Sequence, residues 1–74
     1  MIRAFEPGTG EVASFDEVRG LGTITVAGDR GAELPFHCTA IADGTRTISV
    51  GERVRFQVTP GPAGRWEATH IESF

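Results

Sequence analysis

The sequence has one cysteine, no lysine and no long apolar run. Cys38 cannot form an internal disulfide, and small secreted domains usually need several, so we expect a reducing cytoplasm. No apolar stretch approaches the ~20 residues that span a bilayer, and the amino terminus lacks the basic and apolar regions of a signal peptide. Secretion, membrane insertion and a membrane partner are therefore not expected.

An excess of positive charge is also missing. The seven basic residues, all arginines, face ten acidic residues, and the formal net charge is −3. This balance argues against the long-range cationic field that most duplex-DNA-binding proteins use, so any attraction of a polyanion must be local. Arginine suits local contacts because its planar guanidinium grips phosphate bidentately and stacks on bases, although a composition bias of the source genome would also explain this usage.

Helical periodicity is absent as well. No window keeps apolar residues at helical spacing for three turns, and 10 glycines and 4 prolines interrupt the chain. The patterns instead predict five short strands, at about residues 10–15, 21–26, 33–37, 53–58 and 66–71. A chain of 74 residues makes a single domain, residues 1–74, and such strands with glycine-rich turns suit a small closed barrel.

Catalytic and metal-binding patterns are not recognisable. Structural zinc requires four ligands, whereas His37, Cys38 and His70 offer three, and neighbours on a strand point to opposite faces. Cys38 with His37 lacks an orienting third group, and no phosphate-binding loop or paired-carboxylate motif occurs. We therefore expect no enzyme activity, no metal and no cofactor.

Several motifs follow one another in order along the chain. They are GEV with Phe15, RGLGTI (19–24), FHCTAI (36–41), the turn Asp43-Gly44, GERVRFQV (51–58) and GPAGRWEA (61–68). With these motifs the chain resembles, over about residues 10–71, the bacterial cold-shock protein family. The resemblance implies an all-β fold, a five-stranded antiparallel closed β-barrel of the oligonucleotide-binding type, known as the OB-fold.

The resemblance also implies a binding face, but most of its rings are replaced. In the family the second strand reads Lys-Gly-Phe-Gly-Phe-Ile and the third ends Val-Phe-Val-His-Phe, and these rings stack bases of single-stranded RNA or DNA. The ring positions in this chain are held by Leu21, Thr23, Pro35 and Cys38, with Ser14 and Thr45 at two further aromatic positions. Phe15 and His37 remain from the aromatic set, and Arg19 keeps the basic position.

These replacements predict weakened binding. Each stacked base contributes roughly 1–3 kcal/mol, so losing five or six rings removes several orders of magnitude of affinity. Arg19 and Arg46, with Arg65 as a third candidate, can contact phosphates at the edge of the face, and solvated surface arginine is the alternative. His37 is either a donor to a base or phosphate or a half-buried, hydrogen-bonded histidine of the sheet.

Two interpretations of function follow. The first is a monomeric chaperone or regulator that binds single-stranded RNA or DNA weakly, and the retained Arg19 and His37 favour it. The second is a protein–protein interaction module on the same barrel, marked by an exposed patch of Leu21, Pro35 and Trp66. Trp66 is expected to cover one end of the barrel, with a relocated stacking or protein-contact role as the alternative.

Overall fold

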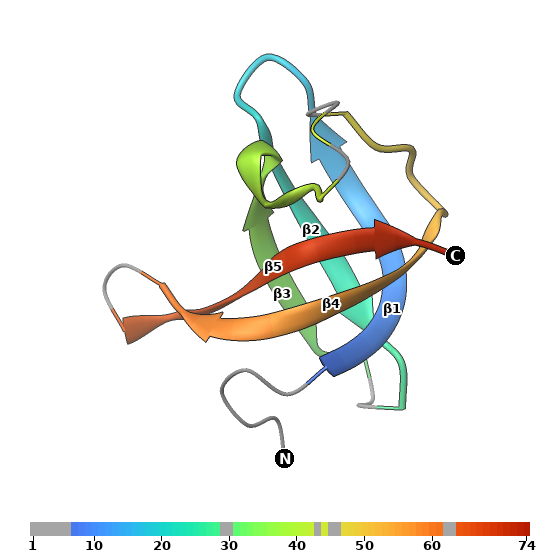
Figure 1. The fold of residues 1–74 in the computed structure, drawn as a ribbon, viewed down its shortest axis with the longest axis vertical. Helices are drawn as coiled ribbons and strands as arrows, with labels where there is room; N and C mark the ends of the chain where they lie inside the picture. Colours follow the sequence, from blue (N-terminus) through green and yellow to red (C-terminus); the bar gives the residue numbers. More distant parts are fainter. Residues whose placement is uncertain (1–6, 29–30, 43, 45–46, 62–63) are drawn as a thin grey trace.

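The computed structural model describes residues 7–28, 31–42, 44, 47–61 and 64–74, so Asp43, Thr45 and Arg46 lie outside the described residues. The elements, in chain order, are β1 (Pro7–Asp16), β2 (Leu21–Val26), β3 (Glu33–His37), the short 3₁₀ helix η1 (Cys38–Ala40), β4 (Arg53–Pro60) and β5 (Trp66–Ser73) (Figure 1). The all-β prediction is confirmed, and β2 and β3 have the predicted bounds. In this part of the chain there is no helix long and apolar enough to cross a membrane.

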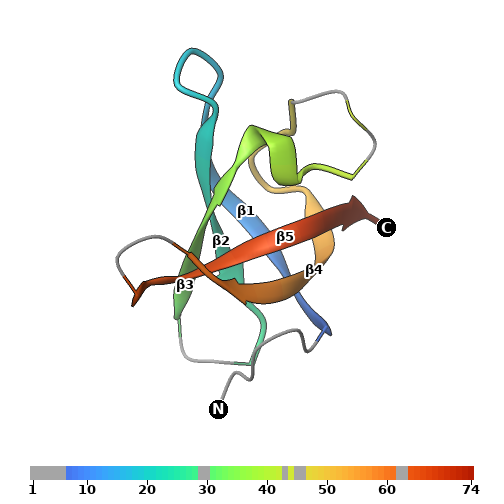
Figure 2. The same ribbon diagram turned by 60° about the vertical axis from the view of Figure 1, so that its left-hand side comes forward.

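The strands form one antiparallel sheet in the order β3-β2-β1-β4-β5. The sheet curls until its two edge strands, β3 and β5, lie side by side (Figures 1 and 2). No ladder joins these edges within the described ranges; an isolated parallel bridge joins Ile41, just after η1, to Ile71 of β5. Side chains of both edge strands pack in one core, but the structure shows no closing of the predicted barrel by strand pairing within these ranges.

Alternation along the strands builds that core. In β4, Val54, Phe56 and Val58 are buried, while Arg53 and Arg55 are exposed, as the sequence predicts. The buried apolar residues form a single cluster, namely Val12, Ile24, Val26, Leu34, Phe36, Ile41, Val54, Phe56, Val58, Ala68 and Ile71. Each large side chain in it contributes roughly 1.5–3 kcal/mol when fully buried, so the core holds the curled sheet together.

A β-bulge in β1 decides which way the last residues of that strand point. The register shifts between Val12, which pairs with Ile24, and Ser14, which pairs with Thr23. Because one extra residue lies between them, Ser14 points outward and Phe15 inward, the reverse of strict alternation from buried Val12.

Gly22 makes room for aromatic packing across the three strands. Phe15 pairs with Gly22, which pairs with Phe36, and the two rings lie parallel with centroids 5.9 Å apart. A Cβ atom on Gly22 would lie 2.5 Å from Cζ of Phe36 and 2.6 Å from the carbonyl oxygen of Ser14. The prediction that Phe36 belongs to the core is confirmed, and a side chain at position 22 would displace its ring.

Candidate nucleic-acid interface

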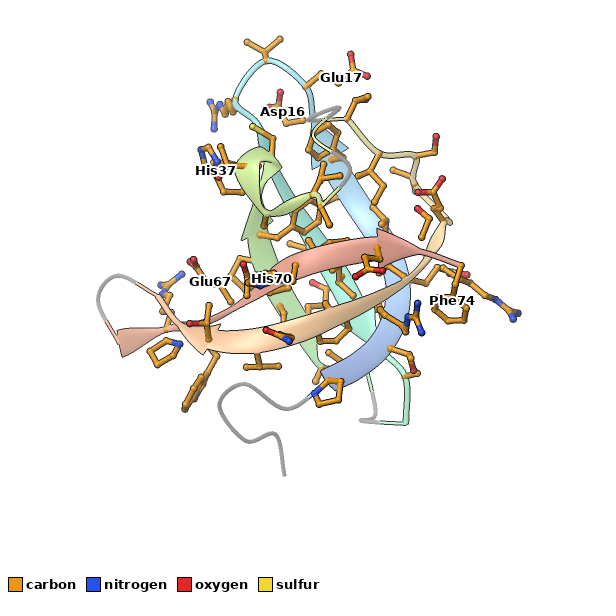
Figure 3. All side chains as sticks on the ribbon, in the orientation of Figure 1. Asp16, Glu17, His37, Glu67, His70 and Phe74 are labelled. Carbon is orange, nitrogen blue, oxygen red and sulfur yellow. The ribbon has the colours of Figure 1, made fainter. Side chains whose placement is uncertain are left out.

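The outward side of β1, β2 and β3 carries two rows of side chains that lie opposite one another across the strands. The rows are Asp16, Leu21 and His37, and then Ser14, Thr23 and Pro35. These six residues are called the β1–β3 face below. The structure thus brings four of the predicted site residues together on one surface, where Leu21 is 49% exposed and His37 lies at the outer end of β3 (Figure 3).

His37 ends β3 and caps η1. The backbone N–H of Thr39 donates to Nδ1 of His37 at 3.3 Å, and the Thr39 hydroxyl lies 3.0 Å from the same nitrogen. A backbone N–H can only donate, so Nδ1 accepts, and the proton of the neutral imidazole then lies on Nε2. This cap orients the exposed ring and leaves Nε2–H available to donate to a base edge or a phosphate.

A pair of hydroxyl groups occupies the centre of the β1–β3 face. Oγ of Ser14 and Oγ1 of Thr23 are 2.8 Å apart and form a hydrogen bond between β1 and β2. One hydroxyl donates to the other, so the proton of the accepting hydroxyl is left for solvent or a ligand. Leu21 and Pro35 flank this pair, and the only aromatic ring of the face is the imidazole of His37. The face can therefore offer hydrogen bonds and apolar contact, with little aromatic stacking.

Asp16 begins the turn between β1 and β2 and stabilises it by hydrogen bonds. Its Oδ1 accepts hydrogen bonds from the N–H groups of Val18 at 3.0 Å and Arg19 at 3.2 Å, and its carbonyl oxygen accepts one from Gly20 at 2.8 Å. Nε of Arg19 lies 3.9 Å from Oδ2 of Asp16, and the arginine side chain is 77% exposed. Because exposed ion pairs contribute only about 0–1 kcal/mol, Arg19 can turn toward a phosphate at small cost.

Two predicted members of the binding surface lie elsewhere. Phe15 packs against the core and stacks on Phe36, so it is not the free stacking ring that the sequence predicts; the bulge in β1 is the reason. Cys38 is not on β3 but begins η1, where it is partly buried against the core. A Cβ atom on Gly20 would lie 2.7 Å from Sγ of Cys38, so this thiol lies directly beneath the β1–β2 turn.

The candidate phosphate contacts do not form one cluster. Arg19 belongs to the β1–β2 turn and Arg65 to the β4–β5 hairpin, and these loops lie at separate corners of the molecule (Figures 1 and 2). Arg46 is outside the described residues. Trp66 is 45% exposed and absent from the core cluster, and its covering of one end of the barrel stays a prediction.

Acidic side chains line a separate hollow of about 500 Å³ beside β5. Glu52 and Glu72 contribute carboxylates to its wall, next to the apolar side chains of Ile41, Ile48 and Ile71. These carboxylates disfavour phosphate, so the hollow does not extend the candidate interface. Among the residues that the structure describes, no group of three or more His, Cys, Asp or Glu side chains could hold a metal ion.

Sequence analysis missed the structural roles of Asp16 and Thr39. Asp16 begins the turn that carries Arg19, and aspartate at such a position commonly accepts hydrogen bonds from the next backbone N–H groups, which is a readable signal. Thr39 follows His37 by two residues and lies in the short helix η1, which no periodicity in the sequence predicts. Its role could be seen only in the structure.

A family model matches this chain over almost its whole length, and known proteins match it over 76%. Residues 8–73 match the family model described as 'Cold-shock' DNA-binding domain. Cold shock-like protein CspA of Stigmatella aurantiaca is 44% identical over 57 residues, which cover 76% of this chain and 82% of that protein. Cold shock-like protein CspD of Vibrio cholerae is 38% identical over 56 residues, with 76% and 74% covered, and cold shock-like protein CspA of Shewanella violacea is 40% identical over 57 residues, with 76% and 80% covered.

The chain therefore belongs to the cold-shock domain family. Membership confirms the predicted resemblance and the OB-type assignment of the five-stranded fold. It also supports the expectation that the protein is not an enzyme, because the family is one of nucleic-acid-binding domains.

Proposed function

We propose that this protein binds single-stranded RNA or DNA across the β1–β3 face, with weakened affinity, as a nucleic-acid chaperone or regulator. One observation carries the proposal: a cold-shock domain presents an oriented His37, a hydroxyl pair and two apolar side chains in adjacent rows on three strands. Such a surface matches a strand whose bases are unpaired and accessible.

Each part of the face has a role in this proposal. Bases lie against Leu21 and Pro35, which supply apolar contact. His37 donates through Nε2–H to a base edge or a phosphate, and the Ser14–Thr23 pair forms one further hydrogen bond. Arg19, at the end of the face, contacts a phosphate and adds salt dependence, as cationic side chains at nucleic-acid interfaces do.

The expected weakness follows from the replaced rings. Leu21, Thr23 and Pro35 stand at positions where the family resemblance implies stacking rings, and each stacked base is worth roughly 1–3 kcal/mol. Apolar contact with Leu21 and Pro35 replaces only a part of that free energy, because it lacks the π-surface of a ring. We therefore expect an affinity well below that of a domain with all its rings.

Anisotropy of a labelled pyrimidine-rich single strand tests the proposal. We expect a saturable rise that weakens with salt and is absent for a duplex of the same length. His37→Ala lowers the affinity, while Val50→Ala, at an exposed apolar residue outside the β1–β3 face, leaves it unchanged. No saturable binding at protein concentrations up to about 1 mM, equivalent to about −4 kcal/mol, would overturn the proposal. The protein-interaction module would then be the interpretation to pursue.

A further inference from the structure

Trp66 presents an exposed aromatic ring at the base of the β4–β5 hairpin. It pairs with Pro60 across the hairpin, and the residue is 45% exposed. Ala68, two residues later on the same side of β5, is buried in the core, so Trp66 continues the inward-facing row beyond the point where the core ends. Its apolar area is therefore only partly used in folding.

The hairpin lies next to the proposed interface. Strand β5 packs beside β3. In both views the first part of β5 projects beyond the edge of the sheet that β3 forms (Figures 1 and 2). A single strand that leaves the β1–β3 face across β3 therefore meets the hairpin. The distance between the β1–β3 face and the hairpin is short for such a polymer, because the described chain extends only 30 Å along its longest axis.

Charge on the hairpin favours a polyanion on the side of Trp66. Arg65, the preceding residue, is exposed and forms no ion pair with any residue that the structure describes. Glu67 points to the opposite side of the strand, where a Cβ atom on Gly61 would lie 2.8 Å from its Cδ. The Glu67 carboxylate therefore lies on the side of the strand opposite the indole, and the guanidinium of Arg65 is close to the indole in sequence.

We propose that Trp66 stacks one unpaired base of the bound single strand and that Arg65 contacts an adjacent phosphate. This inference rests on the proposed function and adds a subsite to it. Base stacking on aromatic side chains tolerates every base, and it needs an accessible aromatic ring; Trp66 supplies an indole and is 45% exposed. The hairpin thus replaces a part of the stacking surface that the β1–β3 face lacks.

The intrinsic fluorescence of the protein tests this directly, because Trp66 is its only tryptophan and it has no tyrosine. Titration with an unlabelled pyrimidine-rich single strand should quench the emission along the same saturation curve that anisotropy reports. Quenching reports contact at Trp66, whereas anisotropy reports binding anywhere on the protein.

Variants measure how much each contact contributes to the affinity. Trp66→Ala should lower the affinity at least about fivefold, and Trp66→Phe should lose less, because a smaller ring is kept. Arg65→Ala should lower the salt dependence with little effect on folding. Phe74→Ala is the matched control, because Phe74 is a 66% exposed ring at the far end of β5 (Figure 3) and its removal should leave the affinity unchanged.

The outcomes separate this inference from the proposed function. Saturable anisotropy without quenching, together with an unchanged affinity of Trp66→Ala, would overturn the Trp66 subsite and leave binding at the β1–β3 face intact. Absence of both signals would overturn both proposals. Equal losses for Trp66→Ala and Phe74→Ala would also contradict the subsite, since they would show a general effect of removing exposed rings.

Discussion

The two faces of β1, β2 and β3 differ in how much aromatic and branched apolar surface they carry. The inner face keeps Phe15 and Phe36 in parallel contact over Gly22, next to Ile24 and Leu34. The outer face, built from the alternate residues of the same strands, carries two hydroxyls, an imidazole, a carboxylate, Leu21 and Pro35. Neighbouring residues on one strand therefore have different roles, because one packs in the core and the next faces solvent.

This difference teaches that the fold and the binding surface of a small barrel can change independently. Inner residues are surrounded by the core, so each change of volume alters stability. Outer residues contact solvent, so replacing a ring there alters the affinity for a ligand while the barrel persists. The predictions below test the inner face first and then the outer face.

Phe36→Ala should have the largest effect. Phe36 is almost fully buried and stacks on Phe15, so its truncation leaves a cavity and should cost about 3–5 kcal/mol of unfolding free energy. Urea denaturation followed by circular dichroism measures the loss. A cost below about 1 kcal/mol would show that the inner face does not hold the barrel together.

Gly22→Ala should destabilise the protein by about 1–3 kcal/mol, because the new methyl group would collide with Phe36 and with the backbone of Ser14. Thr23→Ala, at the neighbouring outward residue, is the control and should cost less. The same denaturation experiment compares them, and equal costs for the two variants would contradict the claim that close packing requires glycine at position 22.

Restoring rings on the outer face should raise affinity. The double variant Leu21→Phe with Thr23→Phe should bind a pyrimidine-rich single strand about tenfold or more tightly, with a small change in unfolding free energy. Position 38 is left unchanged because Cys38 lies beneath Gly20. Val50→Phe adds a ring at an exposed residue outside the face and serves as the control. No gain in the double variant would show that the β1–β3 face does not hold nucleic acid.

Arg19→Ala should have the smallest effect. The slope of log affinity against log salt should fall in magnitude by about 0.7–1, since one phosphate contact is lost, and stability should change by less than about 0.5 kcal/mol. Binding isotherms at several salt concentrations measure the slope. An unchanged slope would show that Arg19 makes no phosphate contact and is an ordinary solvated surface residue.

Much of the fold was predictable from local patterns. Val54, Phe56 and Val58 show the strand period directly, and glycines mark the turns, so strand positions followed from the sequence. The orientation of Phe15 did not, because it depends on a bulge whose extra residue, Ala13, has no distinctive chemistry. Whether a strand alternates without interruption is decided by pairing with its neighbours, which a single sequence does not display.

The candidate site was predictable in part for the same reason. Leu21, Thr23, Pro35 and His37 lie on uninterrupted strands, and alternation alone brings them to one surface. The placement of Cys38 and Trp66 was not predictable. The position of Cys38 depends on where β3 ends and η1 begins. The exposure of Trp66 depends on how far the hairpin projects beyond the core.

Titration of the ¹⁵N-labelled protein with a short pyrimidine-rich single strand, at low and near-physiological salt, tests the central claim most directly. The amide signals of Leu21, Thr23 and His37 should shift saturably and more strongly at low salt, whereas those of Val54, Phe56 and Val58 on the inner side of β4 should stay in place. Absent shifts, or shifts scattered over the whole barrel, would contradict the assignment of the β1–β3 face as a nucleic-acid-binding surface.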